Sequence, residues 1–145
     1  MKFSYGKILG VDLGIKKTGL AISDERWTTI RLLPNLIPKS RMKDIDYLLK
    51  LCSLLDIQFI LIGYPTLPES SNEGMMAKRA RGFYETIGLH ACKKLRIFLI
   101  DEIYTSLDAK KRLKTKKLHL NLLDGESARI LIETFIENQL ALLCD

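Results

Sequence analysis

The stretch that decides the fold spans residues 8–24, with the sequence Ile-Leu-Gly-Val-Asp-Leu-Gly-Ile-Lys-Lys-Thr-Gly-Leu-Ala-Ile-Ser-Asp. Two apolar runs, joined by a short segment rich in glycine and lysine, predict two antiparallel strands and a turn. The aliphatic residues of the first run are typical of a strand buried on both faces. Gly14 and Gly19 suit such a turn, because glycine permits positive φ and close approach of a partner. The stretch therefore predicts a buried hairpin, and its first strand carries one acid, Asp12.

Asp12 has two interpretations at this point. Burying an unpaired carboxylate is costly, so such a group is usually hydrogen-bonded, paired or bound to a metal. Asp12 could lie at the strand end and accept hydrogen bonds from the backbone of its own turn. Alternatively, it could project from a central strand into a cleft and hold a cation. The stretch alone leaves both interpretations open.

Composition limits the class of protein. A chain of 145 residues is long enough to bury a core without disulfides, and we expect one domain over residues 1–145. The three cysteines, Cys52, Cys92 and Cys144, form no Cys-x-x-Cys pair, which favours a reduced, cytoplasmic protein. Two histidines argue against a zinc site. No apolar run approaches the roughly 20 residues of a membrane span, and we expect no membrane partner.

The charge balance favours a polyanionic partner. Lysine and arginine number 23 against 17 acidic residues, a formal net charge of +6. Such a surplus makes nucleic acid the first candidate. The alternative is a soluble protein that is merely basic, because charge alone is a weak indicator.

The rest of the chain alternates between predicted strands and helices. We expect a third strand over 27–34 that is closed by proline, a helix over 44–55 with Asp44 as its N-cap, a strand over 58–63, a helix over 75–92, a strand over 96–100 and a last helix from about Gly125. Three leading strands followed by helix–strand alternation predict an α/β fold with a mixed sheet, three antiparallel strands plus two parallel strands, and flanking helices.

Three acids stand where a predicted element meets a loop, namely Asp12, Glu102 and Asp124. In a parallel half-sheet the strand ends meet at one edge, where ligands collect. Carboxylates held close together repel one another unless a proton or a cation neutralises them, and Mg²⁺ or Mn²⁺ suits oxygen ligands. The alternatives are that Asp124 is an N-cap and that Glu102 is a solvated strand end.

Four segments in this order resemble the motifs of the YqgF family, small bacterial Holliday-junction-resolvase-like proteins that are also described as pre-16S ribosomal RNA nucleases. They are residues 10–24, Ile62-Gly63-Tyr64-Pro65, Asp101-Glu102-Ile103-Tyr104-Thr105-Ser106 and Asp124-Gly125-Glu126-Ser127-Ala128. Together they extend over nearly the whole chain. Two positions depart from the family pattern, Ile103 in place of an arginine and Ser127 in place of an alanine.

The resemblance implies a ribonuclease H-like fold and a metal-dependent nuclease that acts in 5′-end maturation of pre-16S ribosomal RNA. It implies that Asp12, Glu102 and Asp124 are the catalytic residues and metal ligands. In the two-metal mechanism expected of such a site, Asp12 bridges two Mg²⁺ ions and the other two acids each help to hold one.

Basic residues outside the acid cluster are candidates for contact with the nucleic-acid backbone. They are Lys16 and Lys17 in the hairpin turn, Lys78, Arg79 and Arg81 in the predicted helix 75–92, and Lys114, Lys116 and Lys117 in a run over 110–117 in which six of eight residues are basic. The alternative for each set is an ordinary solvated surface.

Three rival functions stay open or are set aside at this stage. A Holliday-junction resolvase acting on branched DNA would use the same site and would need a dimer, so we expect a monomer or a homodimer. A non-catalytic nucleic-acid-binding module stays open because Ile103 lacks the planar cation of arginine. The actin-like and sugar-kinase ATPases also have an Asp-x-Gly hairpin, but they need two such domains around a nucleotide.

Overall fold

Five strands form one mixed sheet in the computed structural model of the chain, which describes residues 5–65, 74–101 and 124–143. They are β1 (Lys7–Asp12), β2 (Thr18–Ser23), β3 (Ile30–Leu36), β4 (Ile57–Tyr64) and β5 (Arg96–Asp101), in the order β3-β2-β1-β4-β5. β1 pairs antiparallel with β2, as β2 does with β3, whereas β1–β4 and β4–β5 are parallel. The predicted sheet is confirmed.

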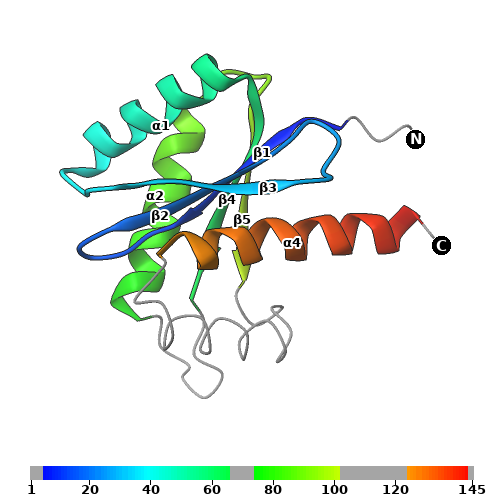
Figure 1. The fold of residues 1–145 in the computed structure, drawn as a ribbon. Coiled ribbons are helices and arrows are strands. Elements are labelled where there is room, and N and C mark those ends of the chain that lie inside the picture. Colours follow the sequence, from blue (N-terminus) through cyan, green and yellow to red (C-terminus); the bar gives the residue numbers. More distant parts are fainter. Residues whose placement is uncertain (1–4, 66–73, 102–123, 144–145) are drawn as a thin grey trace.

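Helices cover both faces of this sheet (Figure 1). α1 (Arg41–Leu55) and α2 (Met75–His90) lie on one face, and α4 (Asp124–Leu143) crosses the other. Within the described ranges, no helix combines the length and the apolar character that crossing a bilayer requires.

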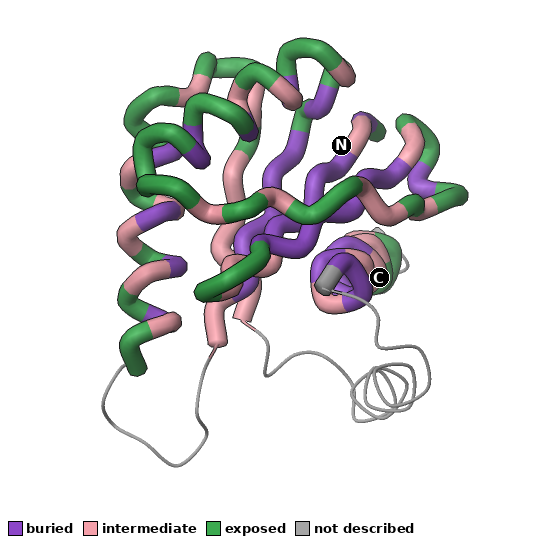
Figure 2. The backbone as a smooth tube through the Cα atoms, turned by 60° about the vertical axis from the view of Figure 1, so that its left-hand side comes forward, coloured by how far each residue is buried: buried purple, intermediate pink, exposed green. Residues whose placement is uncertain are grey.

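Each face has its own core, which Figure 2 shows as the purple central strands and the sheet-facing side of α4. The α1/α2 face is mainly aliphatic, with Leu9, Val11, Leu20, Ile22, Ile60 and Ile62 packed against residues such as Ile45, Leu48, Phe83 and Ile87. The α4 face contains the aromatic cluster Trp27, Phe59, Phe98 and Phe135. Alternating side chains of one strand supply both cores, because successive residues point to opposite faces.

α4 lies unusually close to β1. A Cβ atom placed on Gly10 would lie 2.5 Å from the carbonyl oxygen of Ala128. Residue 10 must therefore lack a side chain for the helix to seat at this distance. Ala128, Ile132 and Phe135 face the sheet, as their spacing predicts.

Several boundaries differ from the sequence-based expectation: β3 begins at Ile30 rather than Trp27, and α2 ends at His90 rather than residue 92. β3 does not close at Pro34 but continues to Leu36. Proline is tolerated there because β3 is an edge strand, and its register with β2 shifts between the Leu20–Leu33 and Thr18–Leu36 pairs, which places one extra residue in β3.

The predicted N-cap of α1 is also wrong. The helix begins earlier, and the Ser40 hydroxyl accepts a hydrogen bond from the Lys43 amide at 3.2 Å. Asp44 is buried in the first turn, where its carboxylate accepts a bond from the Lys39 amide at 3.0 Å. Ser40 caps the helix because it stands just before the first turn. Asp44 instead binds the backbone of the segment that leads into the helix.

Candidate functional site

Asp12 and the start of α4 lie at the same edge of the sheet. β1, β4 and β5 are parallel, so all three end at this edge, which we call the carboxyl edge. α4 runs antiparallel to β1, because Ala128 lies over Gly10 and the later Phe135 contacts Phe59 near the start of β4. Asp124, the first residue of α4, therefore begins the helix at the end where Asp12 closes β1 (Figure 1).

Asp12 lies on the face of the sheet that α4 covers. It alternates with Ile8 and Gly10, which face that helix, and it is half-buried. Asp101, at the end of β5, alternates instead with Ile97 and Leu99, which pack on the α1/α2 side. The strand alternation thus places Asp12 toward the start of α4 and turns Asp101 away from it.

Glu102, the third predicted acid, lies outside the described residues, directly after β5. Within the described part of the chain, no three His, Cys, Asp or Glu side chains are grouped so that they could hold a metal ion. Because Glu102 lies outside that part of the chain, the predicted trio stays a prediction. What the fold provides is a common edge for Asp12, Asp124 and the end of β5.

The turn between β1 and β2 is tight and is anchored from α2. A Cβ atom on Gly14 would overlap the carbonyl oxygen of Lys17, so the chain can fold back here only with glycine. The Arg79 guanidinium donates a hydrogen bond to the Gly14 carbonyl oxygen at 2.6 Å. Arg79, predicted to contact phosphate, therefore holds the turn in place, while Lys16 stays exposed on it.

The other predicted basic contacts divide between exposed and undescribed positions. Lys17 is exposed in the turn, and Lys78 and Arg81 are exposed on α2. Lys114, Lys116 and Lys117 lie outside the described residues. The structure thus places Lys16, Lys17 and Arg79 at the β1–β2 turn, whereas Lys78 and Arg81 are exposed cations of α2.

A polar interaction between α4 and the sheet was not predicted from the sequence. Arg129 donates a hydrogen bond to the Ile30 carbonyl oxygen at 2.8 Å and lies 3.8 Å from the carboxylate of Glu126. Opposite charges three residues apart on a helix could have indicated the Arg129–Glu126 pair. The bond to β3 joins residues 99 positions apart, and no local pattern reveals it.

A hollow of about 780 Å³ lies at the other end of the sheet, between the ends of α1 and α2 and the starts of β4 and β5. Lys93, Lys94 and Arg96 contribute to its lining, as do Cys52 and Cys92. Burial raises the pKa of the Cys52 thiol to about 12, so this cysteine is a poor nucleophile and metal ligand at neutral pH.

A mixed sheet in the order β3-β2-β1-β4-β5, with helices on both faces and an acid ending its central strand, is a ribonuclease H-like fold, as expected. The chain superposes on T. thermophilus RuvC in complex with a Holliday junction substrate with a TM-score of 0.60 and 12% identity, covering 90% of this chain and 92% of that one. Residues 6–138 match the family model described as "RuvX: Holliday junction resolvase". The chain belongs to the RuvX family, the YqgF group expected from its motifs.

Relatives of similar length carry one name. A protein of Sulfurihydrogenibium sp. (strain YO3AOP1) is 31% identical over 134 residues, which cover 90% of each chain. A protein of Anaeromyxobacter sp. (strain K) is 27% identical over 137 residues, 92% of this chain and 98% of the relative. Both are named "Putative pre-16S rRNA nuclease". Family, fold and relatives together support a nuclease.

Proposed function

We propose that this protein is a divalent-metal-dependent nuclease that hydrolyses phosphodiester bonds in 5′-end maturation of pre-16S ribosomal RNA. The observation that supports it best is the position of Asp12. It ends β1 at the edge of the sheet where α4 begins, and it lies on the face that α4 covers. This role also implies a nucleic-acid partner and a cytoplasmic protein. The relatives named as pre-16S rRNA nucleases support the substrate.

The residues at the carboxyl edge fit Mg²⁺ or Mn²⁺. Asp12 is half-buried at a strand end, and Asp124 and Glu102 supply further carboxylates, the hard oxygen donors that such cations prefer. When bound, these ions supply a water of lowered pKa as nucleophile and neutralise charge on the leaving oxygen. Asp12, Glu102 and Asp124 would hold them.

The chain's own cations would bind and orient the substrate. Lys16 and Lys17 lie four and five residues after Asp12 on an exposed turn, where they can contact phosphates on either side of the scissile bond. The bond from Arg79 to the Gly14 carbonyl keeps this turn in one conformation. A fixed turn aids catalysis because a bound strand then keeps its register against the carboxylates.

A second candidate function is cleavage of branched DNA. The family description and the RuvC-like fold favour it, and both functions use the same acids. A resolvase must cut two strands, so this alternative requires a homodimer, whereas processing of one RNA end does not.

The test compares three end-labelled substrates: a pre-16S ribosomal RNA fragment, a four-way DNA junction and a linear DNA duplex. Each is incubated with purified protein in Mg²⁺, in Mn²⁺ or in EDTA, and Asp12→Asn prepared in parallel reveals contaminating nucleases. We expect metal-dependent cleavage of the RNA only. Cleavage of the junction alone would establish the second candidate, and equal cutting by wild type and Asp12→Asn would refute both.

A further inference from the structure

A second hollow, of about 340 Å³, lies on the α1/α2 side of the sheet, next to the start of α1. Its lining comes from the segment that leads into α1, from the first turn of α1 and from α2: Pro38, Lys39, Ser40, Arg41, Asp44, Arg79 and Phe83. Three of these residues are cationic and one is acidic. The three cations were not predicted as a group, because Arg79 is far from Lys39 and Arg41 in the sequence.

The one acid of this hollow is already engaged. Asp44 is 5% exposed, and its carboxylate accepts a hydrogen bond from the Lys39 amide at 3.0 Å. Within the described ranges, neither the Lys39 ammonium nor the Arg41 guanidinium forms an ion pair. The hollow therefore has an excess of positive charge that the described residues do not neutralise.

A glycine of the neighbouring helix leaves room for the Arg41 side chain in this position. A Cβ atom on Gly82 would lie 2.6 Å from a terminal nitrogen of the Arg41 guanidinium. Glycine weakens the interior of a helix, yet here it gives the guanidinium room to lie against α2. Arg79 is one turn earlier on the same helix and lines the same hollow. Two guanidiniums gathered at one hollow repel each other unless an anion lies between them.

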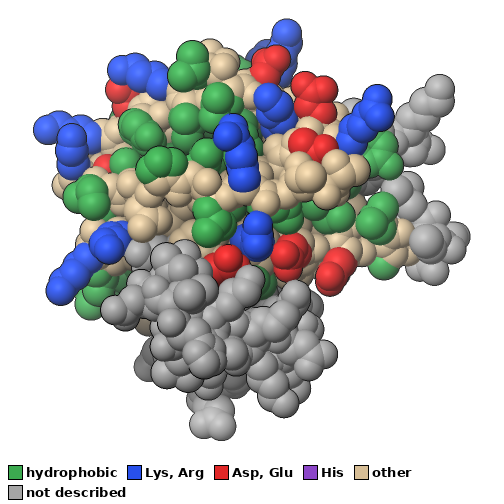
Figure 3. Space-filling model, viewed as in Figure 1, with side chains coloured by type: hydrophobic (Ala, Val, Ile, Leu, Met, Phe, Trp, Pro, Cys, Tyr) green, Lys and Arg blue, Asp and Glu red, His purple; other side chains and the backbone are tan. Residues whose placement is uncertain are grey.

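Arg79 also connects this hollow to the carboxyl edge. It donates to the carbonyl oxygen of Gly14, two residues beyond Asp12, while it lines the hollow. An arginine has five N–H donors, so one bond to Gly14 leaves others for a ligand. Figure 3 shows Lys and Arg side chains along the left-hand edge of the molecule, where α1 begins and the β1–β2 turn lies (compare Figure 1).

We propose that this hollow binds a backbone phosphate of the nucleic-acid strand, with Lys39 and Arg41 as its ligands. A planar guanidinium offers paired donors to phosphate oxygens, and a phosphate would neutralise the excess charge. The proposal rests on the proposed function and extends it: a strand held at Asp12 passes the β1–β2 turn and continues to the start of α1.

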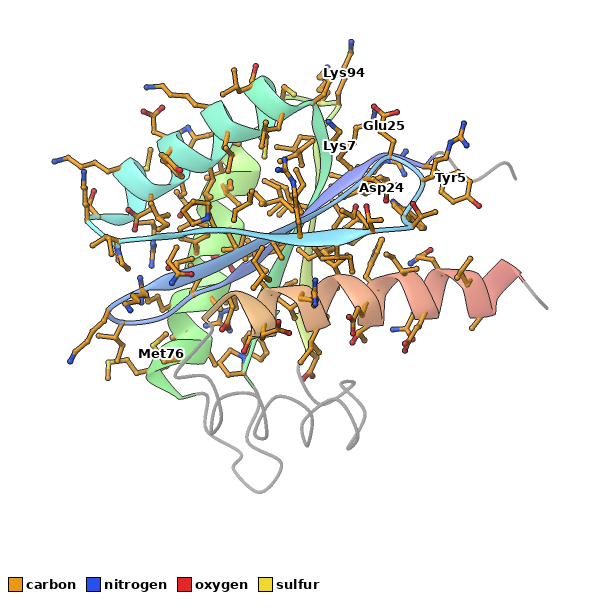
Figure 4. All side chains as sticks on the ribbon, in the orientation of Figure 1. Tyr5, Lys7, Asp24, Glu25, Met76 and Lys94 are labelled. Atoms are coloured by element: carbon orange, nitrogen blue, oxygen red, sulfur yellow. The ribbon has the colours of Figure 1, made fainter. Side chains whose placement is uncertain are left out.

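The experiment measures binding of a fluorescein-labelled single-stranded RNA by anisotropy, in EDTA, at several KCl concentrations. For single strands the logarithm of affinity falls with the logarithm of salt by about 0.7 per phosphate contact. The double variant Lys39→Gln/Arg41→Gln should flatten the slope by about 1.4. The matched control, Lys93→Gln/Lys94→Gln, removes the same charge at the opposite end of the molecule, where Figure 4 labels Lys94, and should keep the wild-type slope.

A second pair of variants tests the position of Arg41 without removing any charge. Gly82→Ala adds a methyl group that displaces the guanidinium, whereas nothing lies within 4 Å of a Cβ atom on Gly88. Both changes replace a helical glycine by a better helix former, so neither should lower the melting temperature. We expect weaker RNA binding in Gly82→Ala only.

Unchanged slopes in the Lys39/Arg41 variant would overturn the proposal, as would equal flattening in the control or wild-type binding by Gly82→Ala. A hollow that takes only a free anion would also leave the RNA slope unchanged. Because the assay contains no metal and needs no cleavage, its outcome is separate from that of the proposed function. The protein could bind RNA in this hollow without cutting it, or cut RNA without using it.

Discussion

Asp12 ends one strand of the hairpin and Asp24 directly follows the other, and they lie at opposite edges of the sheet because β1 and β2 are antiparallel. Asp24 closes its own turn: its carboxylate accepts hydrogen bonds from the Thr28 hydroxyl at 2.5 Å and from the amides of Thr28 and Thr29 at 2.6 and 3.0 Å. The hydroxyl bond, with the Thr29 amide next, lowers the pKa of Asp24. Asp12 instead faces the start of α4.

Neither the number of basic residues nor the size of a hollow distinguishes the candidate site from the opposite edge of the sheet. The edge with Asp24 has the larger of the two hollows, about 780 Å³, and its own basic residues. What distinguishes the carboxyl edge is direction: three parallel strands end there and α4 begins there. Ligands collect at such edges because the strand ends and the loops that follow them converge.

The largest expected effect is on cleavage. Asp12→Asn should lower the cleavage rate more than about a hundredfold, because even indirect supports of metal ligands are typically worth 10–100-fold. Glu102→Gln should behave likewise. Asp24→Asn makes the same chemical change at the other edge and should cut at nearly the wild-type rate. Rate constants for labelled RNA under single-turnover conditions provide the measurement, and equal losses in the Asp12 and Asp24 variants would remove the distinction between the two edges.

The basic run 110–117 should contribute to binding from the carboxyl edge. It lies in sequence between β5, which ends at that edge, and α4, which begins there. Replacing Lys114, Lys116 and Lys117 by alanine should flatten the salt dependence of RNA affinity by about 2, at roughly 0.7 per phosphate contact. A slope identical to that of wild type in anisotropy titrations would assign this run to ordinary solvated surface.

Metal should stabilise the wild-type fold through the carboxyl edge. An ion that binds the folded state only adds RT ln(1 + [L]/Kd), about 1.4 kcal/mol at ten times Kd. For a chain of this length that raises the melting temperature by roughly 3–6 °C. Asp12→Asn should lose most of the shift, and Asp24→Asn should keep it. The measurement is a melting curve of each protein in EDTA and in excess Mg²⁺. An equal rise in melting temperature in all three proteins would mean that the ion binds away from Asp12.

The smallest expected effect concerns pH and belongs to Asp24. Its pKa is lower in the folded protein than the usual 3.8, so its turn stabilises the fold above that value. The contribution is lost as pH falls through the folded pKa, because the carboxyl group becomes protonated and no longer accepts the three bonds. Asp24→Asn should therefore show a shallower loss of melting temperature between neutral pH and pH 3. If wild type and Asp24→Asn lose the same melting temperature over this pH range, the turn does not depend on the charge of Asp24.

Sequence patterns were sufficient for the sheet and for the positions of Asp12 and Asp124 at element ends, while their role in a site stays a prediction. Short connections between apolar runs predicted the antiparallel half, and helix–strand alternation predicted the parallel half. Asp12 and the Asp124 motif were found because both stand at element ends. Glu102 lies outside the described residues, so its place in the site stays a prediction.

Contacts between distant residues were beyond the reach of those patterns. Arg79 looked like one more surface cation, but its bond to Gly14 spans 65 positions. No local pattern indicates that Arg41 lies against Gly82, because 41 positions separate them. Asp44 was mistaken for a cap because both Ser40 and Asp44 are good capping residues, and only the observed bonds distinguish them.

The close seat of α4 on Gly10 also sets the order in which the protein can become active during its synthesis. β1 leaves the ribosome early, whereas the helix that covers it follows all five strands in the sequence. A growing chain that has not reached Asp124 has Asp12 but lacks its partner acid, and the apolar side chains of Ile8 and Leu61 have no helix over them. We therefore expect a growing chain that has not reached Asp124 to be unable to cut the RNA around it.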